Sequence, residues 1–235
     1  MVKKTLVDAY KNIRKTGLIA VKLREKDELR FISITSGNDY VVMITRNGQG
    51  IVFKESDIRP MGRSAAGVMG IRLKASDEVI AMATFSQENE LALKFELLTV
   101  LENGFGKRTP IIKHFPTQKR GGYGVRASKT NDKTGKVVGA IIFDNPKQDL
   151  IQVSKSGQII RIPLKSAKLL GRDTQGVRLM RLHAGDKVAS VSAVEINLPD
   201  NGQEKTEVPT KKETGRIDLK SIEVHYYDNN KNDRT

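Results

Sequence analysis

Basic residues gather without acidic ones in the middle of the chain. The stretch from Asn103 to Asn131 contains no aspartate or glutamate, yet seven lysines and arginines fall within it. Side chains of one charge repel one another unless they face water or a polyanion such as the phosphates of nucleic acid. Taken alone, the stretch fits a hydrated basic face as well as a phosphate-binding surface. The seven cations are Lys107, Arg108, Lys113, Lys119, Arg120, Arg126 and Lys129.

A glycine pair stands beside one of these cations. Gly121 and Gly122 follow Arg120 directly. Glycine lets the backbone approach a phosphate closely and offer its N–H groups to it, but it also serves tight loops that need a positive φ. Both interpretations stay open for the pair. Tyr123 could stack on a base, although packing against a neighbouring strand is the simpler expectation.

Basic residues recur at matching places elsewhere in the chain. Arg63, Arg120 and Arg172 each lie four positions ahead of a glycine, and a second set follows three turns. Recurrence favours a continuous cationic track over an isolated hydrated face. Val52 stands where a cation would continue the second set, so the track is expected to be interrupted there. The second set consists of Lys4, Arg108 and Arg161.

The elements that position these cations form a repeat. Turn glycines at 48, 104 and 157 are followed nineteen, twenty and nineteen residues later by glycines at 67, 124 and 176. The three arginines accordingly recur at intervals of 57 and 52 residues. Asp27, Asp77 and Asp186 lie ten residues after a glycine, where an aspartate can accept backbone N–H groups before a new strand begins. Each unit has room for about four strands, the size of one propeller blade.

Short apolar runs bounded by Gly, Asn, Asp or Pro predict an all-β fold. The nearest approach to a helix, at about Leu164–Leu170, is one or two turns long. Three full units and one incomplete unit suggest about four blades, the first of which begins part-way through at Met1. The principal expected strands are Gly17–Leu23, Val41–Ile44, Ile51–Phe53, Val68–Leu73, Val137–Phe143 and Val177–Leu179.

Composition narrows the function classes. The 235 residues are 38% hydrophobic and 5% aromatic, contain no tryptophan, and carry a formal net charge of +14. Such an excess predicts a polyanionic partner: nucleic acid first, an acidic membrane surface second, although no basic amphipathic helix is visible to lie on a membrane. The absence of cysteine rules out disulfides and thiol chemistry. We therefore expect a soluble, cytoplasmic protein with no membrane span.

The chain divides into three parts by composition. Residues 1–198 are predicted to hold the repeat units, 199–216 to form a polar linker, and 217–235 to form a C-terminal edge strand followed by a disordered tail.

Three motifs in register carry a family resemblance: Ser56–Arg63, Asn103–Thr109 and Gly171–Val177. They resemble the C-terminal domain of bacterial DNA gyrase A. The resemblance implies a β-pinwheel, a propeller-like wheel, normally of six blades, whose neighbouring blades exchange strands. It also implies a basic rim around which DNA bends, an A-subunit dimer, the B-subunit of gyrase for a partner, and a nucleoid-associated location. The beginning inside a blade would make this an N-terminally truncated member.

The family's wrapping box of glutamine, basic residues and glycines has a counterpart in Gln118–Gly124, with Tyr123 in place of its last basic residue. Its late position suggests a degenerate copy in a middle blade. The resemblance and the repeat together predict one set of DNA-binding residues. They are Lys4, Arg59, Arg63, Lys107, Arg108, Lys119, Arg120, Gly121, Gly122, Arg161, Lys165 and Arg172.

Catalysis is not expected of this chain. His114, His183 and His225 are scattered, without carboxylates at metal-ligand spacing, and none of the tyrosines has the helical setting that DNA cleavage requires. We expect no cofactor and no metal. The predicted function is sequence-independent binding and bending of duplex DNA in support of ATP-dependent negative supercoiling. The alternatives are the DNA-steering C-terminal domain of the topoisomerase IV A-subunit, or a propeller scaffold that binds acidic proteins.

Overall fold

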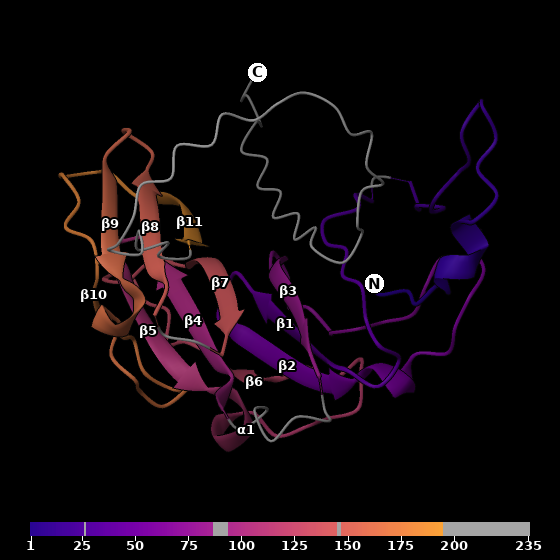
Figure 1. The fold of residues 1–235 in the computed structure, drawn as a ribbon. Coiled ribbons are helices and arrows are strands. Elements are labelled where there is room, and N and C mark those ends of the chain that lie inside the picture. Colours follow the sequence, from indigo (N-terminus) through magenta and orange to yellow (C-terminus); the bar gives the residue numbers. More distant parts are fainter. Residues whose placement is uncertain (26, 87–93, 145–146, 195–235) are drawn as a thin grey trace, which may run out of the picture.

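Three antiparallel sheets stand side by side in an arc (Figure 1). The computed structural model describes residues 1–25, 27–86, 94–144 and 147–194. The first sheet has the strand order β3-β1-β2-β6, the second β10-β5-β4-β7, and the third β11-β8-β9. The strands are β1 (Tyr40–Thr45), β2 (Gln49–Lys54), β3 (Val79–Phe85), β4 (Glu96–Leu101), β5 (Phe105–Pro110), β6 (Val125–Arg126), β7 (Val137–Phe143), β8 (Asp149–Ser154), β9 (Ile159–Pro163), β10 (Val177–Arg178) and β11 (Val188–Val194).

Neighbouring sheets exchange a strand. After completing the β4–β5 hairpin, the chain returns to the first sheet, where β6 pairs with β2 through Gln49↔Arg126 and Gly50↔Val125. It does the same one repeat later, when β10 pairs with β5. The N-terminal residues make the equivalent contact through the single bridge Val2↔Val68. The first two blades are thus each closed by a segment of the next repeat, which confirms the all-β pinwheel.

The second glycine of each repeat makes this exchange possible. Gly124 and Gly176 have φ values of +70° and +82°, which side chains rarely tolerate. A Cβ atom on either would overlap the carbonyl oxygen of Gly50 or Gly106 in the preceding blade. The positive φ and the close backbone contact both demand glycine, so the spacing recognised in the sequence marks the points where blades meet.

The repeated aspartates tie the last strand of a blade to its hairpin turn. The Asp77 carboxylate accepts the N–H of Asn47 at 2.9 Å, and the Asp186 carboxylate accepts the N–H of Ser156 at 3.1 Å. In each case the next strand, β3 or β11, begins two positions later. The prediction that the aspartate accepts backbone N–H groups before a new strand begins is therefore confirmed for Asp77 and Asp186.

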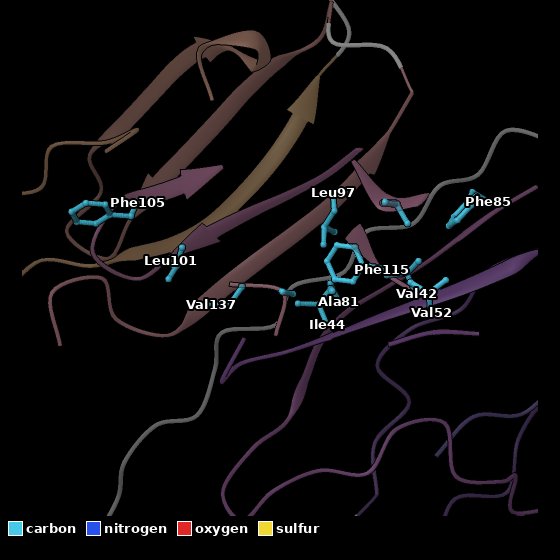
Figure 2. Packing of buried hydrophobic residues seen from close by; sticks show 12 residues of the cluster. Val42, Ile44, Val52, Ala81, Phe85, Leu97, Leu101, Phe105, Phe115 and Val137 are labelled. Carbon is cyan, nitrogen blue, oxygen red and sulfur yellow. The ribbon is translucent and has the colours of Figure 1, made fainter. Parts of the chain in front are cut away.

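Several small cores replace one large core. A first cluster lies between the first two sheets, where Val42 and Ile44 of β1 gather with Leu97 of β4 and Phe115 (Figure 2). A second joins β4 and β7 to β8 and β11, through residues such as Leu98 and Leu150. Val, Ile and Leu side chains make up most of these two cores, in keeping with the low aromatic content and the absence of tryptophan.

One edge of every sheet faces the inside of the arc. Strand β7 packs against both β3 and β11, and these three are the edge strands of their sheets. Opposite them, β6 and β10 form the outer edges of the first two sheets. Segments on that outer side are therefore the ones a long ligand could follow from blade to blade.

Two expected strands are wrong. Gly17–Leu23 and Val68–Leu73 contain no strand, apart from the bridge at Val68. Only the first two residues after a repeat glycine pair with the preceding blade, as β6 and β10 show, and the chain then turns away. Residues 1–25 and 27–36 hold isolated bridges at Val2 and Lys4 but no strand. The helix-like segment is present as the 3-10 turn η4 (Leu164–Ser166).

The predicted linker at 199–216 and the edge strand and tail at 217–235 lie outside the described residues. In the described part of the chain, no helix has the length and apolar character needed to cross a bilayer.

Candidate nucleic-acid interface

Three equivalent loops form the outer rim of the wheel: residues 55–66, 111–123 and 164–175, here called the rim loops. Each begins with a short helical turn: η2 (Glu55–Asp57), α1 (Ile111–His114) or η4 (Leu164–Ser166). The first residue of each turn, Glu55, Ile111 or Leu164, is buried and anchors the loop. Figure 1 shows α1 at the lower margin of the molecule. Most of the predicted DNA-binding residues lie on or beside these loops.

The three recurring arginines hold neighbouring repeats together. The Arg63 guanidinium donates to the carbonyl oxygen of Ile19 at 2.6 Å, that of Arg120 to Met69 at 3.1 Å, and that of Arg172 to Arg126 at 3.2 Å. Every acceptor lies two residues after the repeat glycine of the preceding unit. The three are here called the clasp arginines. They occupy matching places, as predicted, but each guanidinium already has a protein partner.

Lys107 is placed differently from the sequence expectation. Its side chain is fully buried, and its ammonium donates to the carbonyl oxygens of Gly171 and Arg172 and to Oγ1 of Thr174. Burial lowers the pKa of Lys107 to about 7, with Asp173 opposing the shift and Arg172 adding to it. A buried ammonium with three acceptors cannot reach a phosphate, so Lys107 organises a rim loop instead. Ile51 holds the matching place in the first sheet.

The cations that follow the hairpin turns are paired with carboxylates. Lys4 pairs with Glu55 at 3.0 Å, Arg108 with Glu96 at 2.8 Å and Arg161 with Asp149 at 2.6 Å. The side chains of Lys4 and Arg108 are mostly covered, at 18% and 13% exposure, whereas Arg161 is 57% exposed. Arg161 therefore still presents charge to the solvent, and the other two serve mainly to join segments of the fold.

The remaining predicted cations point outward. Arg59, Lys119 and Lys165 are exposed on the three rim loops, and none forms an ion pair with a carboxylate in the described ranges. Two further rim-loop lysines share this setting, Lys113 and Lys168. Lys168 was missed, although it stands where Arg59 stands in the first rim loop. Unpaired cations thus occur on all three rim loops.

The glycine pair serves the loop itself. Gly121 has a φ of +81°, and its N–H donates to the carbonyl oxygen of Gly70 at 2.6 Å. The carbonyl oxygen of Gly122 accepts the N–H of Arg72 at 2.8 Å. The N–H of Gly121 is therefore not free for a phosphate, which supports the tight-loop interpretation. Tyr123 is 53% exposed, and the Arg72 guanidinium lies over its ring at 5.4 Å from the centroid.

Sequence reasoning also missed a further series of cations, of which it had named only Lys129, as part of the basic stretch. One basic residue stands five positions after each repeat glycine at 17, 67, 124 and 176, and all four are exposed. The regular spacing is present in the sequence, but exposure at every repeat emerges only from the fold. We call them the seam cations, because they border the line between two repeats. They are Lys22, Arg72, Lys129 and Arg181.

No metal centre competes with this surface in the residues that the structure describes, where no three His, Asp or Glu side chains gather as ligands. His114 is half-buried and His183 exposed, while His225 lies outside the described ranges. The arrangement instead offers outward cations on an outer edge that is repeated from blade to blade.

Strand-exchanging antiparallel blades with cation-bearing outer loops define a propeller-like repeat protein. The family described as "DNA gyrase C-terminal domain, beta-propeller" matches residues 1–36, 39–86, 96–144 and 148–195. The chain belongs to this family. The four matched segments coincide with the four repeats.

Individual relatives agree. The A-subunit of DNA gyrase from Haloquadratum walsbyi is 40% identical over 190 residues, which cover 81% of this chain and 22% of the relative. The A-subunit of DNA gyrase from Klebsiella oxytoca is 37% identical over 199 residues, which cover 85% of this chain and 22% of the relative. The chain thus spans about a fifth of the length of these curated relatives.

Two solved structures are similar. A DNA gyrase A C-terminal domain is 29% identical with a TM-score of 0.62, over 76% of this chain and 58% of that one. The C-terminal domain of a DNA topoisomerase IV is 22% identical with a TM-score of 0.74, over 83% of this chain and 59% of that one. The second likeness supports the fold alone.

Proposed function

We propose that this chain binds duplex DNA through its phosphates and bends it along the outer edge of the wheel. The observation that carries the proposal is the set of exposed rim-loop cations without carboxylate partners in the described ranges, on a chain whose net charge is +14. Bending suits an arc of blades, since successive loops present charge along a curved edge. The described helical elements have at most four residues, so no recognition helix is available among them to read bases, and selection would follow DNA deformability.

Within a complete gyrase, this module would support ATP-dependent negative supercoiling, with two partners: a second A-subunit of gyrase, and its B-subunit. The cutting and ATP-hydrolysing chemistry would belong to those other parts. Family membership and the similar relatives support this context, and a cytoplasmic, nucleoid-associated location is part of the same proposal. The residues proposed for DNA contact from the predicted set are Arg59, Lys119, Arg161 and Lys165, with the clasp arginines, Lys4, Arg108, Gly121 and Gly122 supporting the rim.

A salt titration with duplex DNA tests binding. Affinity should fall with salt at a slope of about −0.9 per phosphate neutralised, and longer duplexes should bind more tightly. Absence of binding at low salt would refute the proposal and favour a scaffold for acidic proteins. Ligation of a nicked circle in the presence of the chain tests bending into a wrap. A systematic change in linking number supports wrapping, whereas binding without a change points to a steering role like that considered for topoisomerase IV.

A further inference from the structure

We infer that the seam cations form a second row of DNA-phosphate contacts, separate from the clasp arginines and the rim-loop cations. The row consists of Lys22, Arg72, Lys129 and Arg181, one from each repeat. The inference rests on the proposed function and assigns part of it to residues that neither the rim-loop series nor the family resemblance singled out.

The seam cations differ in exposure from the residues directly before them. The preceding position holds Val21, Ile71, Ser128 and Met180, of which the last three are buried. That residue therefore packs inward, and the seam cation directly after it is exposed in all four repeats. Chemical character varies at the inward position, whereas the outward position is basic every time. A requirement for positive charge at a fixed place explains this pattern better than general hydration of the surface.

Backbone contacts place three of the four at the boundary with the next repeat. The N–H of Lys22 donates to the carbonyl oxygen of Arg63 at 3.2 Å. The N–H of Arg72 donates to Gly122 at 2.8 Å, and that of Lys129 to Thr174 at 3.0 Å. Each acceptor belongs to the rim loop of the following repeat. The seam cations are thus held beside the rim loops by their main chains, and their side chains are left to project outward.

The clasp arginines and the seam cations contact neighbouring repeats in different ways. A clasp arginine donates its guanidinium to a carbonyl oxygen of the preceding repeat. Lys22, Arg72 and Lys129 contact the following repeat through their backbones, so the charges of their side chains remain available. None of the four seam cations forms an ion pair with a carboxylate in the part of the chain that is described. The Arg72 guanidinium lies over the exposed Tyr123 ring, which holds it at the surface.

Charges that recur along an edge and lack carboxylate partners in the described ranges suit a ligand with regularly repeated negative charge, such as the phosphates of a duplex. Neutralising phosphates releases counterions, so each seam cation in contact should add about 0.9 to the magnitude of the salt slope. The ligand class is the phosphodiester backbone of double-stranded DNA, with no dependence on base sequence.

The test compares two double variants that remove the same charge. The seam variant is Arg72→Gln with Lys129→Gln. The control, called the hub variant, is Lys136→Gln with Lys155→Gln. Both lysines are exposed and lie at a cavity on the inside of the arc: Lys155 lines the cavity, and Lys136 precedes the lining residue Val137. Salt titrations of duplex DNA are measured for both and for the unchanged chain. We expect the seam variant to lower the magnitude of the slope by about 1.8 and the hub variant to leave it unchanged.

Three results would overturn the inference: no change in the seam variant, an equal change in both variants, or a fall in the seam variant's melting temperature large enough to account for weaker binding. The charge-preserving variant Arg72→Lys with Lys129→Arg provides the complementary check, since it must keep the original slope. Should the unchanged chain fail to bind DNA at low salt, the proposed function itself is refuted, an outcome distinct from the other three.

Discussion

The Arg46 guanidinium and the Glu102 carboxylate meet at 3.1 Å across the boundary between the first and second sheets. Arg46 also forms an ion pair with Glu78 of its own repeat at 3.0 Å. Glu102 forms another with Lys187, from the repeat of the third sheet, at 3.5 Å. Glu102 therefore links all three blades at the inside of the arc. Its side chain is only 12% exposed, so solvent screens these contacts less than it screens surface ion pairs.

Replacing this carboxylate should reduce stability in a pH-dependent way. Burial raises the pKa of Glu102, but the Lys136 N–H, the Arg46 guanidinium and the charges of Lys187 and Arg46 outweigh burial and leave the pKa below its usual 4.5. A carboxyl group whose folded pKa is depressed contributes stability above its unfolded pKa and loses it as the pH falls through the folded value. We expect Glu102→Gln to cost about 1–2 kcal/mol at neutral pH. Urea unfolding should show that the difference shrinks below pH 4.5; a difference that stays constant well below that pH would contradict the prediction.

Lys107 should give a pH dependence of the same sign, but in the alkaline range. Its pKa is about 7 in the folded protein and 10.5 as the ordinary value, so the unfolded chain binds more protons between these limits. Stability due to this group must then rise with pH from about 7 to 10.5. Lys107→Ile, which copies Ile51 of the first sheet, should remove that rise. The check is the unfolding free energy of both proteins between about pH 6.5 and 9.5; parallel curves would show that Lys107 keeps an ordinary pKa.

The clasp arginine Arg120 and the exposed arginine Arg59, both on rim loops, should differ in the effect of their replacement. Arg120→Gln removes the bonds to Asp57 at 3.0 Å and to Met69 at 3.1 Å, and should lower the unfolding free energy by about 1–3 kcal/mol. Arg59→Gln, its matched control, alters an exposed residue and should leave stability within about 0.5 kcal/mol while weakening DNA binding. Thermal unfolding and DNA titration of both variants are the measurements. Equal melting temperatures of the Arg120→Gln and Arg59→Gln variants would contradict a stabilising role for the clasp arginine.

Gly176, where two blades meet, should be less replaceable than Gly157 in the hairpin turn of the third sheet. Gly157 has a φ of +87° with open space around its missing Cβ, so Gly157→Ala should cost about 1 kcal/mol of backbone strain. Gly176 has a similar φ of +82°, but its Cβ would overlap the backbone of Gly106. We expect Gly176→Ala to cost at least about 3 kcal/mol, because strain and overlap add. Comparable losses in the two variants, measured by urea unfolding, would mean that β10 can move away from β5 at little cost.

Local requirements were readable from the residues. A positive φ at a turn is a demand on one position, so Gly124 and Gly176 reveal the repeat wherever the chain happens to fold. The Asp77 turn, the short β-branched runs and the excess of positive charge are likewise properties of short segments or of composition. They suffice for an all-β repeat fold and for an affinity toward polyanions. Residue by residue, however, the candidate interface was only partly predictable.

Tertiary packing decided which cations face the solvent. Lys107 and Lys119 are the same residue type within one basic stretch, yet one is enclosed by the Gly171–Thr174 loop of the following repeat and the other is exposed. The difference depends on a segment about 65 positions away, and no local pattern records that approach. Charge and turn geometry belong to the residues themselves, whereas burial belongs to the pair of segments that meet. For that reason the sequence sufficed for the repeat and its charge, and only the assembled blades separated the clasp arginines from the cations left free for a partner.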